Sequence, residues 1–377
     1  MLAHLCFPVE QSRGRRYPEP EHSWRNLFQR DRDRIIHTRA FRRLENKTQV
    51  FAPEVSDHFR NRLTHTLEVS QIARTVAGAL GLNEDLTEAL SLAHDIGHPP
   101  FAHAGEEALH QQMQQYGLGF DHNLQALRIV EDLEQRYPRF SGLNLTFEVR
   151  EGIAKHSRDF GPGEFPELDQ YLPGERPPLE AQLIDLADEI AYNAADLDDA
   201  YEAGLLQPEA IAAAVPAYHE ILDAVETQFP GATGRERFQE SVRHLIDRLV
   251  SSFMEGTVGA VRASGVSDVA GVRAHPERLA QFTSAGRATS LGLKRFLFTN
   301  VYASETLAAG RVESMEQVGR LFRFLMDHPE QYPKGRETGA HSPRAVCDFL
   351  AGMTDRYFQR FYREAFAADI TVGHILP

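Results

Sequence analysis

The sequence predicts an all-α protein. Apolar residues recur at spacings of three and four through most of the chain, which is the period of an amphipathic helix. Alternating Val- and Ile-rich stretches, the usual signature of a strand, are almost absent, and proline or glycine separates the helical runs. Beyond short helices in 24–51, we expect helices over residues 62–80, 83–96, 100–116, 123–136, 146–156, 179–202, 208–228, 235–263, 290–303, 312–327 and 343–367.

The chain of 377 residues is long enough for one large domain or two. We expect an irregular segment over 1–24, a core over 25–204, and a helical region over 205–377. That last region either packs on the core or continues it as one domain, because helices lie on both sides of residue 204. Residues 157–178 are rich in proline and glycine and predict a long loop, typical of a lid or an insertion.

Composition excludes several classes of protein. With 40 basic and 54 acidic residues the net charge is −14, so bulk electrostatics do not favour a polyanion, and a phosphate site requires a local basic concentration. The two cysteines, Cys6 and Cys347, exclude a disulfide framework and a cysteine-rich zinc site, and they suit a reducing compartment. No stretch approaches the ~20 apolar residues of a membrane helix. We therefore expect a cytoplasmic protein without a signal peptide or a membrane partner.

Residues 24–51 are locally basic. They form either a solvated helix face, or a rim that faces phosphates or single-stranded nucleic acid, and the sequence leaves both readings open. The basic side chains are Arg25, Arg30, Arg32, Arg34, Arg39, Arg42, Arg43 and Lys47.

Residues 92–106 concentrate imidazoles and carboxylates. Five of the chain's 17 histidines, His94, His98, His103, His110 and His122, lie within residues 94–122. The adjacent pair His94–Asp95 ends one predicted helix, and Gly97 with two prolines stops it. His103 and Glu106 then stand three apart on one face of the next helix. A buried Asp beside a buried His is costly without a positive partner, for which a divalent metal is the simplest choice. The alternative is a capped helix end with solvated histidines.

The helix predicted over 179–202 carries a polar stripe beside its apolar face. Asp185, Asp188, Tyr192 and Asp196 follow one another at spacings of three, four and four, which places them along one side. The alternative is an exposed acidic surface. His65, in the first turn of the helix over 62–80, would by itself be a structural histidine.

The order of these motifs resembles a known family. His65, then His94–Asp95, then a distant Asp188 is similar to the metal-binding pattern of HD-domain phosphohydrolases. The wider set of motifs resembles the deoxyguanosinetriphosphate triphosphohydrolase-like proteins, and it implies an HD-domain helical core with additional C-terminal helices. The matching motifs are Arg39 to Leu44, Lys47 to Phe51, Asn61 to Thr66, His94 to Glu106, Phe120 to Asn123, Lys155–His156 and Asp188 to Asp196.

The resemblance implies an activity and a role for each matching residue. Members of this family hydrolyse a deoxynucleoside triphosphate, dGTP or several dNTPs, to the deoxynucleoside and inorganic triphosphate. The implied metal ligands are His65, His94, Asp95 and Asp188, and the implied catalytic pair is His103 and Glu106. Implied substrate contacts are Arg62, Lys155, His98 and His122 at the phosphates, Gln49 and Val50 at the nucleoside, and Tyr192 and Asp196 at the deoxyribose.

The ligand set and the family also imply partners. Two imidazoles and two carboxylates suit Mn²⁺ or Mg²⁺ and also accept Fe, Co or Ni. Relatives are homo-oligomers, either hexamers or dimer-based assemblies, and some respond to a nucleotide effector. Two alternatives stay open. One is another HD phosphohydrolase, such as a 5′-nucleotidase or a (p)ppGpp or cyclic-nucleotide hydrolase. The other is a nucleotide-sensing or single-strand-binding protein with a vestigial site.

Overall fold

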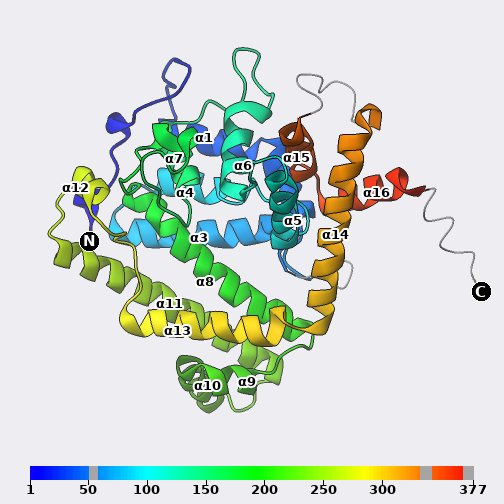
Figure 1. The fold of residues 1–377 in the computed structure, drawn as a ribbon. Helices are drawn as coiled ribbons and strands as arrows, with labels where there is room; N and C mark the ends of the chain where they lie inside the picture. The colour runs from blue at the N-terminus through cyan, green and yellow to red at the C-terminus, as the bar shows by residue number, and fades with distance from the viewer. Residues whose placement is uncertain (51–57, 332–341, 368–377) are drawn as a thin grey trace, which may run out of the picture.

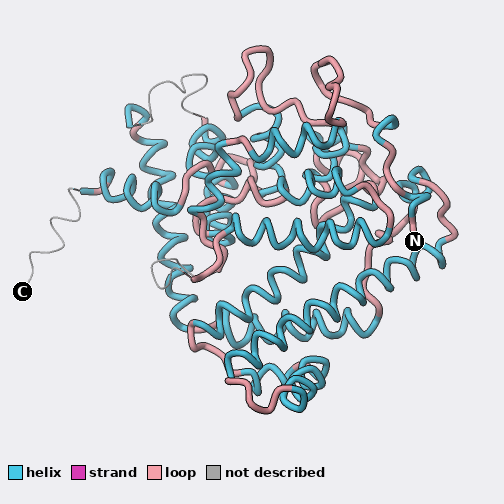
Figure 2. Tube along the Cα trace, turned by 180° about the vertical axis from the view of Figure 1, so that it is seen from behind, coloured by secondary structure: helices cyan, strands magenta, loops and turns pink. Residues whose placement is uncertain are grey.

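The computed structural model describes residues 1–50, 58–331 and 342–367, and helices account for most of them (Figure 1). The view from behind shows that the described residues form helices and loops, with no strand (Figure 2). They contain only isolated β-bridges, such as the one between Arg15 and Thr146. The all-α prediction is confirmed. The helices are α1 (Leu27–Ile36), α2 (Arg39–Arg43), α3 (Arg62–Leu80), α4 (Glu84–Ala93), α5 (Ala102–Gln114), α6 (His122–Arg128), α7 (Phe147–Ala154), α8 (Leu179–Glu202), α9 (Pro208–Ala214), α10 (Pro216–Gln228), α11 (Gly234–Ser264), α12 (Val269–Ala274), α13 (Ser284–Leu297), α14 (Glu305–Asp327), α15 (Pro343–Ala351) and α16 (Asp355–Ala365).

Local signals place the ends of the helices that matter most. The Asn61 side chain accepts a hydrogen bond from the backbone of Thr64 and starts α3, as Asn83 does for α4 through Leu86. Gly81, with a φ of 81°, closes α3 in the left-handed conformation that glycine tolerates best. Because these caps fix the helix ends, they also fix where His65 and His94 stand.

Several predicted runs are interrupted. The run over 208–228 is divided at Val215, because the following Pro216 disfavours helical geometry in the residue before it. The run over 343–367 ends at Ala351 and begins again after Thr354, whose side chain caps α16. The helix expected over 83–96 already ends at Ala93. These breaks turn three expected helices into shorter helices separated by corners.

The larger hydrophobic cluster surrounds α3 and α8. These two helices pack on each other and on α4, and α11 and α13 lie along the other side of α8 (Figure 1). Buried members of this cluster run from Leu2 to Val301. The cluster therefore continues through residue 204 without a break, and the division of the chain into domains stays a prediction.

A second hydrophobic cluster joins α5 to the C-terminal helices. Ala108, Leu109 and Met113 of α5 are buried together with residues of α14, α15 and α16, which gather on one side of the molecule (Figure 1). The helix that carries His103 and Glu106 therefore packs mainly with segments 200 or more residues further along the chain. In the described part of the chain, no helix is long and apolar enough to cross a membrane.

The corner after α4 leaves no room for a side chain at Gly97. A Cβ atom there would overlap the carbonyl oxygen of His122 and the backbone of Ala126, both in α6. Because backbone atoms cannot turn away as side chains do, we expect Gly97→Ala to destabilise the fold by about 1–3 kcal/mol, as overpacking does. Thermal unfolding followed by circular dichroism measures the change.

Gly259 provides the matched control for this substitution. It lies in α11, and a Cβ there would meet nothing within 4 Å. Gly259→Ala should therefore stabilise the protein by about 0.5–1 kcal/mol, the usual gain of alanine over glycine inside a helix. Equal unfolding temperatures for Gly97→Ala and the wild type would show that α6 does not hold this corner closely.

Candidate metal centre

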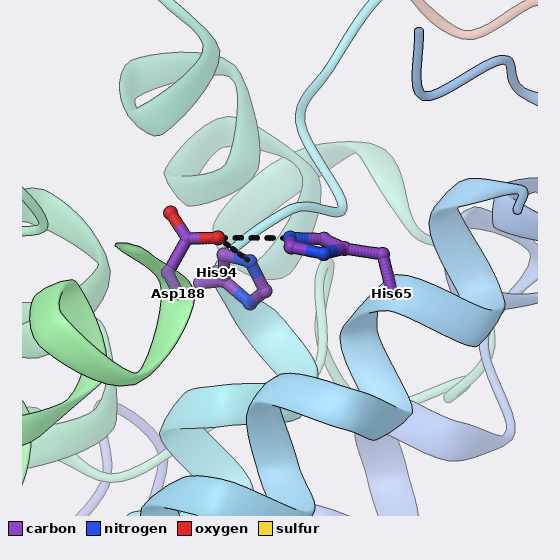
Figure 3. Close-up of side chains that lie close together, drawn as sticks. All are labelled: His65, His94 and Asp188. Carbon is purple, nitrogen blue, oxygen red and sulfur yellow. Dashed lines mark hydrogen bonds and ion pairs between the residues drawn. The ribbon is translucent and has the colours of Figure 1, made fainter. Parts of the chain in front are cut away.

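Three helices bring two imidazoles and a carboxylate to one point. His65 comes from the first turn of α3, His94 follows the last residue of α4, and Asp188 lies in the middle of α8. The Nε2 atom of His65 is 2.8 Å from Oδ1 of Asp188, and Nε2 of His94 is 3.9 Å from the same oxygen (Figure 3). The ligand atoms of the three residues all lie within 4.8 Å of one another, as a metal site requires.

Asp95 completes the expected set of four. Its Oδ1 atom is 3.6 Å from Nε2 of His94 and 2.9 Å from Nδ1 of His98. Its other oxygen accepts a hydrogen bond of 2.7 Å from the Arg62 guanidinium. The four side chains that the sequence named as ligands are therefore neighbours, although they are spread over residues 65 to 188.

The protonation state of His94 shows that this group suits a cation. Its Nδ1 atom is 2.6 Å from the carbonyl oxygen of Ser91, which can only accept, so Nδ1 carries the proton and Nε2 holds a lone pair. That Nε2 atom is buried without a hydrogen-bond partner and faces the carboxylates of Asp95 and Asp188. A lone pair and two carboxylates repel one another unless a cation lies among them. The donor set therefore fits a divalent metal ion.

The surroundings favour the metal-binding forms of Asp95 and His94, whereas for His65 the hydrogen bond and charge of Asp188 outweigh burial and raise the pKa of the ring. Burial alone would raise the pKa of Asp95, but the positive charge of the Arg62 guanidinium outweighs it and lowers that pKa. Burial lowers the pKa of His94 and favours the neutral ring. The result is ionised carboxylate beside neutral imidazole, which is the state in which both act as ligands.

A second group of side chains adjoins the first. Glu106 of α5 accepts hydrogen bonds from the His122 backbone at 3.0 Å and from Nδ1 of its ring at 2.8 Å. Nδ1 of His103 is 3.6 Å from the same carboxylate, and the His103 side chain is 81% exposed. His98 stacks on His122 with ring centres 4.0 Å apart, which joins this group to Asp95. The group thus combines an imidazole held by two hydrogen bonds, that of His122, with a largely exposed imidazole, that of His103.

Known proteins with the same pattern fall into one family. Residues 62–193 match the HD domain model, and residues 280–364 match the phosphohydrolase-associated domain. A deoxyguanosinetriphosphate triphosphohydrolase-like protein of Ralstonia nicotianae is 46% identical over 98% of this chain and 95% of its own length. Two further relatives carry the same name. The one from Geobacter sulfurreducens is 45% identical over 92% of this chain and 90% of its own length. The one from Caulobacter vibrioides is 42% identical over 96% of this chain and 95% of its own length.

The chain belongs to the deoxyguanosinetriphosphate triphosphohydrolase-like family. With its HD domain and its cluster of histidines and aspartates, it is a metal-dependent phosphohydrolase.

The polar stripe of α8 continues away from the cluster of His65, His94 and Asp188. Asp196 accepts a hydrogen bond from the hydroxyl of Tyr302, and burial raises the pKa of Asp196 to about 7. The ammonium of Lys294 lies 5.6 Å from the centre of the Tyr192 ring and pairs with Glu189 at 2.7 Å. Tyr302 and Lys294 reach the stripe from beyond residue 280, so the sequence pattern of α8 alone did not assign them.

The structure does not support the phosphate contact expected of Lys155. Its ammonium is fully buried and donates to Glu151 at 3.0 Å and to the carbonyl oxygens of Leu172 and Glu175 at 2.9 Å each. All three donors are used, because the loop over 157–178 folds back on the end of α7. In this structure no donor of Lys155 remains for a substrate.

His156, the next residue, faces the metal cluster instead. Its ring centre is 5.4 Å from that of His94, and its Nε2 atom is 4.0 Å from Oδ2 of Asp188. Its Nδ1 atom pairs with Asp185 at 2.8 Å. Sequence analysis placed Asp185 on the polar stripe but gave no role to His156. The available signal was a histidine in the same motif as Lys155.

Three other residues, Arg62, Gln49 and Val50, were expected to contact the substrate, and the structure shows the surroundings of each. Arg62 is held by Asp95 at the cluster, as a phosphate contact would require. The Gln49 side-chain carbonyl is buried without a hydrogen-bond partner, so an acceptor is available to a ligand, and Val50 packs partly buried against the larger cluster.

Ion pairs take up much of the positive charge in residues 24–51. Arg25 pairs with Asp33 at 2.6 Å, Arg32 with Glu88 at 3.1 Å, and Arg34 with Glu19 at 2.7 Å. These three arginines are engaged within the fold, and whether the segment also binds single-stranded nucleic acid stays a prediction.

Proposed function

We propose that the protein hydrolyses deoxynucleoside triphosphates to the deoxynucleoside and inorganic triphosphate. The observation that carries this proposal is the order of groups along one face of α8. Asp188 belongs to the metal cluster, Tyr192 stands one turn further on, and Asp196 two turns further on. A ligand with phosphates at the metal ligands and a sugar at the following turns matches that order.

Four residues would hold the metal ion in this reaction. His65, His94, Asp95 and Asp188 provide two nitrogens and two carboxylate groups, which suit Mn²⁺ or Mg²⁺ and also accept Fe, Co or Ni. When bound, such an ion would polarise a phosphoryl oxygen and offset charge that develops at phosphorus. Arg62, held against Asp95, adds positive charge on the same side.

The second histidine group supplies acid–base chemistry. Water attacks the α-phosphorus, the bond from phosphorus to the 5′ oxygen breaks, and that oxygen leaves with a proton. His103 is the proposed donor, because its ring is exposed and its Nδ1 atom lies beside the Glu106 carboxylate. His122, fixed by two hydrogen bonds to Glu106, and His98, stacked on it, would line the phosphate end.

Sugar selection is assigned to the stripe of α8. Tyr192 under the C2′ atom would leave no space for a ribose hydroxyl, and Asp196 would accept a hydrogen bond from the 3′-OH. The Asp196 carboxylate already accepts from Tyr302, which holds it in one orientation. Gln49, with an unused buried carbonyl, and Val50 would contact the nucleoside.

Replacing Tyr192 should relax the discrimination against ribonucleotides. A pocket that excludes one small group by shape contributes about 10- to 200-fold in selectivity. The selectivity here is kcat/KM for dGTP divided by kcat/KM for GTP, and we expect this ratio to be lower in Tyr192→Ala by a factor of about ten or more. Tyr201→Ala is the matched control, because Tyr201 lies on the same helix but stacks on Phe238. An unchanged ratio in Tyr192→Ala would remove this side chain from the sugar pocket.

One assay tests the proposed reaction directly. The protein is incubated with each of the four dNTPs and with Mn²⁺ or Mg²⁺, and the products are separated by ion-exchange chromatography. Inorganic triphosphate together with the deoxynucleoside supports the proposal. Release of monophosphate or pyrophosphate would instead indicate another HD phosphohydrolase, and absence of turnover would favour a nucleotide-sensing role. Oligomeric state, a nucleotide effector and single-strand binding stay predictions of the family resemblance.

A further inference from the structure

The helix that carries His103 and Glu106 packs in a different hydrophobic cluster from the helices that carry the proposed metal ligands. Helices α3, α4 and α8, which carry the metal ligands, pack in the larger cluster. Helix α5, which carries His103 and Glu106, packs in the smaller one with α14, α15 and α16. The position of the proton donor relative to the metal ligands therefore depends on contacts that cross from one cluster to the other.

The chain crosses between the clusters through a strained corner. Phe101 and Ala102 both have positive φ values, 62° and 52°, and neither is glycine. Such backbone conformations are unfavourable for residues other than glycine and persist only where surrounding contacts hold them. His103 follows immediately, so whatever holds Phe101 and Ala102 also sets the direction in which His103 leaves the corner.

Asp355, the first residue of α16, provides that hold. Its Oδ1 atom accepts a hydrogen bond of 3.1 Å from the backbone N–H of Phe101. Its Oδ2 atom accepts from the backbone N–H of Thr48 at 2.8 Å and from the Thr48 hydroxyl at 2.5 Å. The Asp355 side chain is buried, and the ring of Phe358, one turn further along α16, packs edge-on against Phe101 at 5.0 Å. One carboxylate thus joins the corner before His103 to the residue before Gln49.

A buried lysine makes a parallel connection. The Lys47 ammonium donates to the carbonyl oxygen of His98, on one side, and to that of Ala351 in α15 at 3.2 Å, on the other. Lys47 and Thr48 are adjacent, so the two connections meet at the start of the segment that carries Gln49. The N-terminal segment, the corner and the C-terminal helices are therefore tied together at one place.

We propose that Asp355 is a positioning residue that sets the place of His103 and of Gln49 relative to the metal ligands. Its effect on turnover rests on the function proposed above. The chemistry requires a carboxylate: three donors converge on two oxygens, whereas asparagine offers one acceptor and an NH₂ group that would face a donor. Residues of the phosphohydrolase-associated region thereby contribute to the arrangement of the catalytic corner.

Asp355→Asn tests the proposal in two independent ways. First, hydrogen–deuterium exchange at the amides of Thr48 and Phe101 should rise at least about tenfold, while exchange along α3 stays as in the wild type. Second, kcat for a dNTP should fall about 10- to 100-fold, because displacing a reacting group by 1 Å can cost that much. The affinity for Mn²⁺, measured by titration calorimetry, should stay within about twofold, since no metal ligand contacts Asp355.

Two further variants serve different purposes. One removes a single hydrogen bond to Oδ2 of Asp355, and the other tests whether the effect of Asp355→Asn is only a general loss of stability. Thr48→Val removes only the hydroxyl bond, and it should raise KM with kcat nearly unchanged. Asp348→Asn is the matched control, because Asp348 also joins a C-terminal helix to the rest of the chain, through Arg128 of α6, without touching the corner. It should leave kcat and the exchange of Phe101 unchanged.

The outcomes distinguish this proposal from the proposed reaction. Unchanged exchange at Thr48 and Phe101 in Asp355→Asn overturns the positioning role, whatever the activity. A drop in kcat as large in Asp348→Asn as in Asp355→Asn overturns it as well. A wild-type protein that hydrolyses no dNTP contradicts the proposed function, and the exchange measurement still decides the role of Asp355. Should Asp355→Asn fail to fold, Phe358→Leu, which keeps the Asp355 carboxylate but weakens the packing on Phe101, takes its place, with exchange followed at Phe101 and kcat measured as before.

Discussion

Replacing Asp188 by asparagine is expected to lower turnover at least about a thousandfold and to abolish binding of Mn²⁺. Asp188 is the carboxylate that both His65 and His94 face, at 2.8 Å and 3.9 Å. Its loss removes one of two negative charges from the cluster and leaves an amide NH₂ group able to point at the ligands. Metal ions supply several kcal/mol of transition-state stabilisation, and each 1.36 kcal/mol corresponds to a factor of ten in rate.

The metal-binding measurement separates this effect from a change in the fold. Titration calorimetry with Mn²⁺ and circular dichroism of the same sample report on the ion and on the helices. Asp198→Asn is the matched control, because Asp198 lies on the same helix and pairs with Arg60 at 2.9 Å near the surface. We expect it to bind Mn²⁺ and turn over substrate like the wild type. An Asp188→Asn protein that still binds the ion would exclude this carboxylate from the ligand set.

The helices around this cluster were predictable because their signals are local. Helices α3 and α8 begin and end at the residues that sequence periodicity indicated. Asn61 and Asn83 cap the following helices through side-chain contacts made within three residues. That His65, His94 and Asp188 lie close together was also predictable, because their order along the chain matches a family pattern even though no local rule places α3, α4 and α8 side by side.

Contacts between distant segments could not be predicted from the sequence. Lys155 was expected at the phosphates, but the carbonyl oxygens of Leu172 and Glu175 take its ammonium. The path of the loop over 157–178 determines which groups the Lys155 ammonium contacts. The composition of this segment indicates only that it is a loop, not where it runs. His156 was missed for the same reason: its partner Asp185 lies 29 residues further along, and its direction depends on how α7 ends.

The pairing of α5 with the C-terminal helices was likewise beyond the sequence pattern. Apolar periodicity shows that α5, α14 and α15 each have a face to bury, but not which faces meet. Hence the motif predicted that His103 and Glu106 are neighbours, whereas the exposure of His103 and its greater distance from Glu106, compared with that of His122, were not predictable. This difference has a measurable consequence.

His103→Ala is expected to lower kcat by about 10²–10⁴, the usual contribution of a general acid or base. The His103 ring is exposed and only approaches Glu106 at 3.6 Å, so its removal should cost little stability and leave binding of Mn²⁺ unchanged. The combination of a large loss in kcat with an intact metal affinity is what distinguishes a proton donor from a ligand. Steady-state kinetics with a dNTP and calorimetry with Mn²⁺ measure the two quantities.

His122→Ala should behave differently, because His122 is held by two hydrogen bonds to Glu106 and stacks on His98. We expect its loss to raise KM and to lower the unfolding temperature, with a smaller effect on kcat than that of His103→Ala. His110→Ala is the control for a histidine on α5, the helix of His103 and Glu106, since His110 contacts the carbonyl of Phe120 outside this group. If His122→Ala lowers kcat more than His103→Ala does, the proton comes from His122, and the exposed ring of His103 serves only to bind the phosphates.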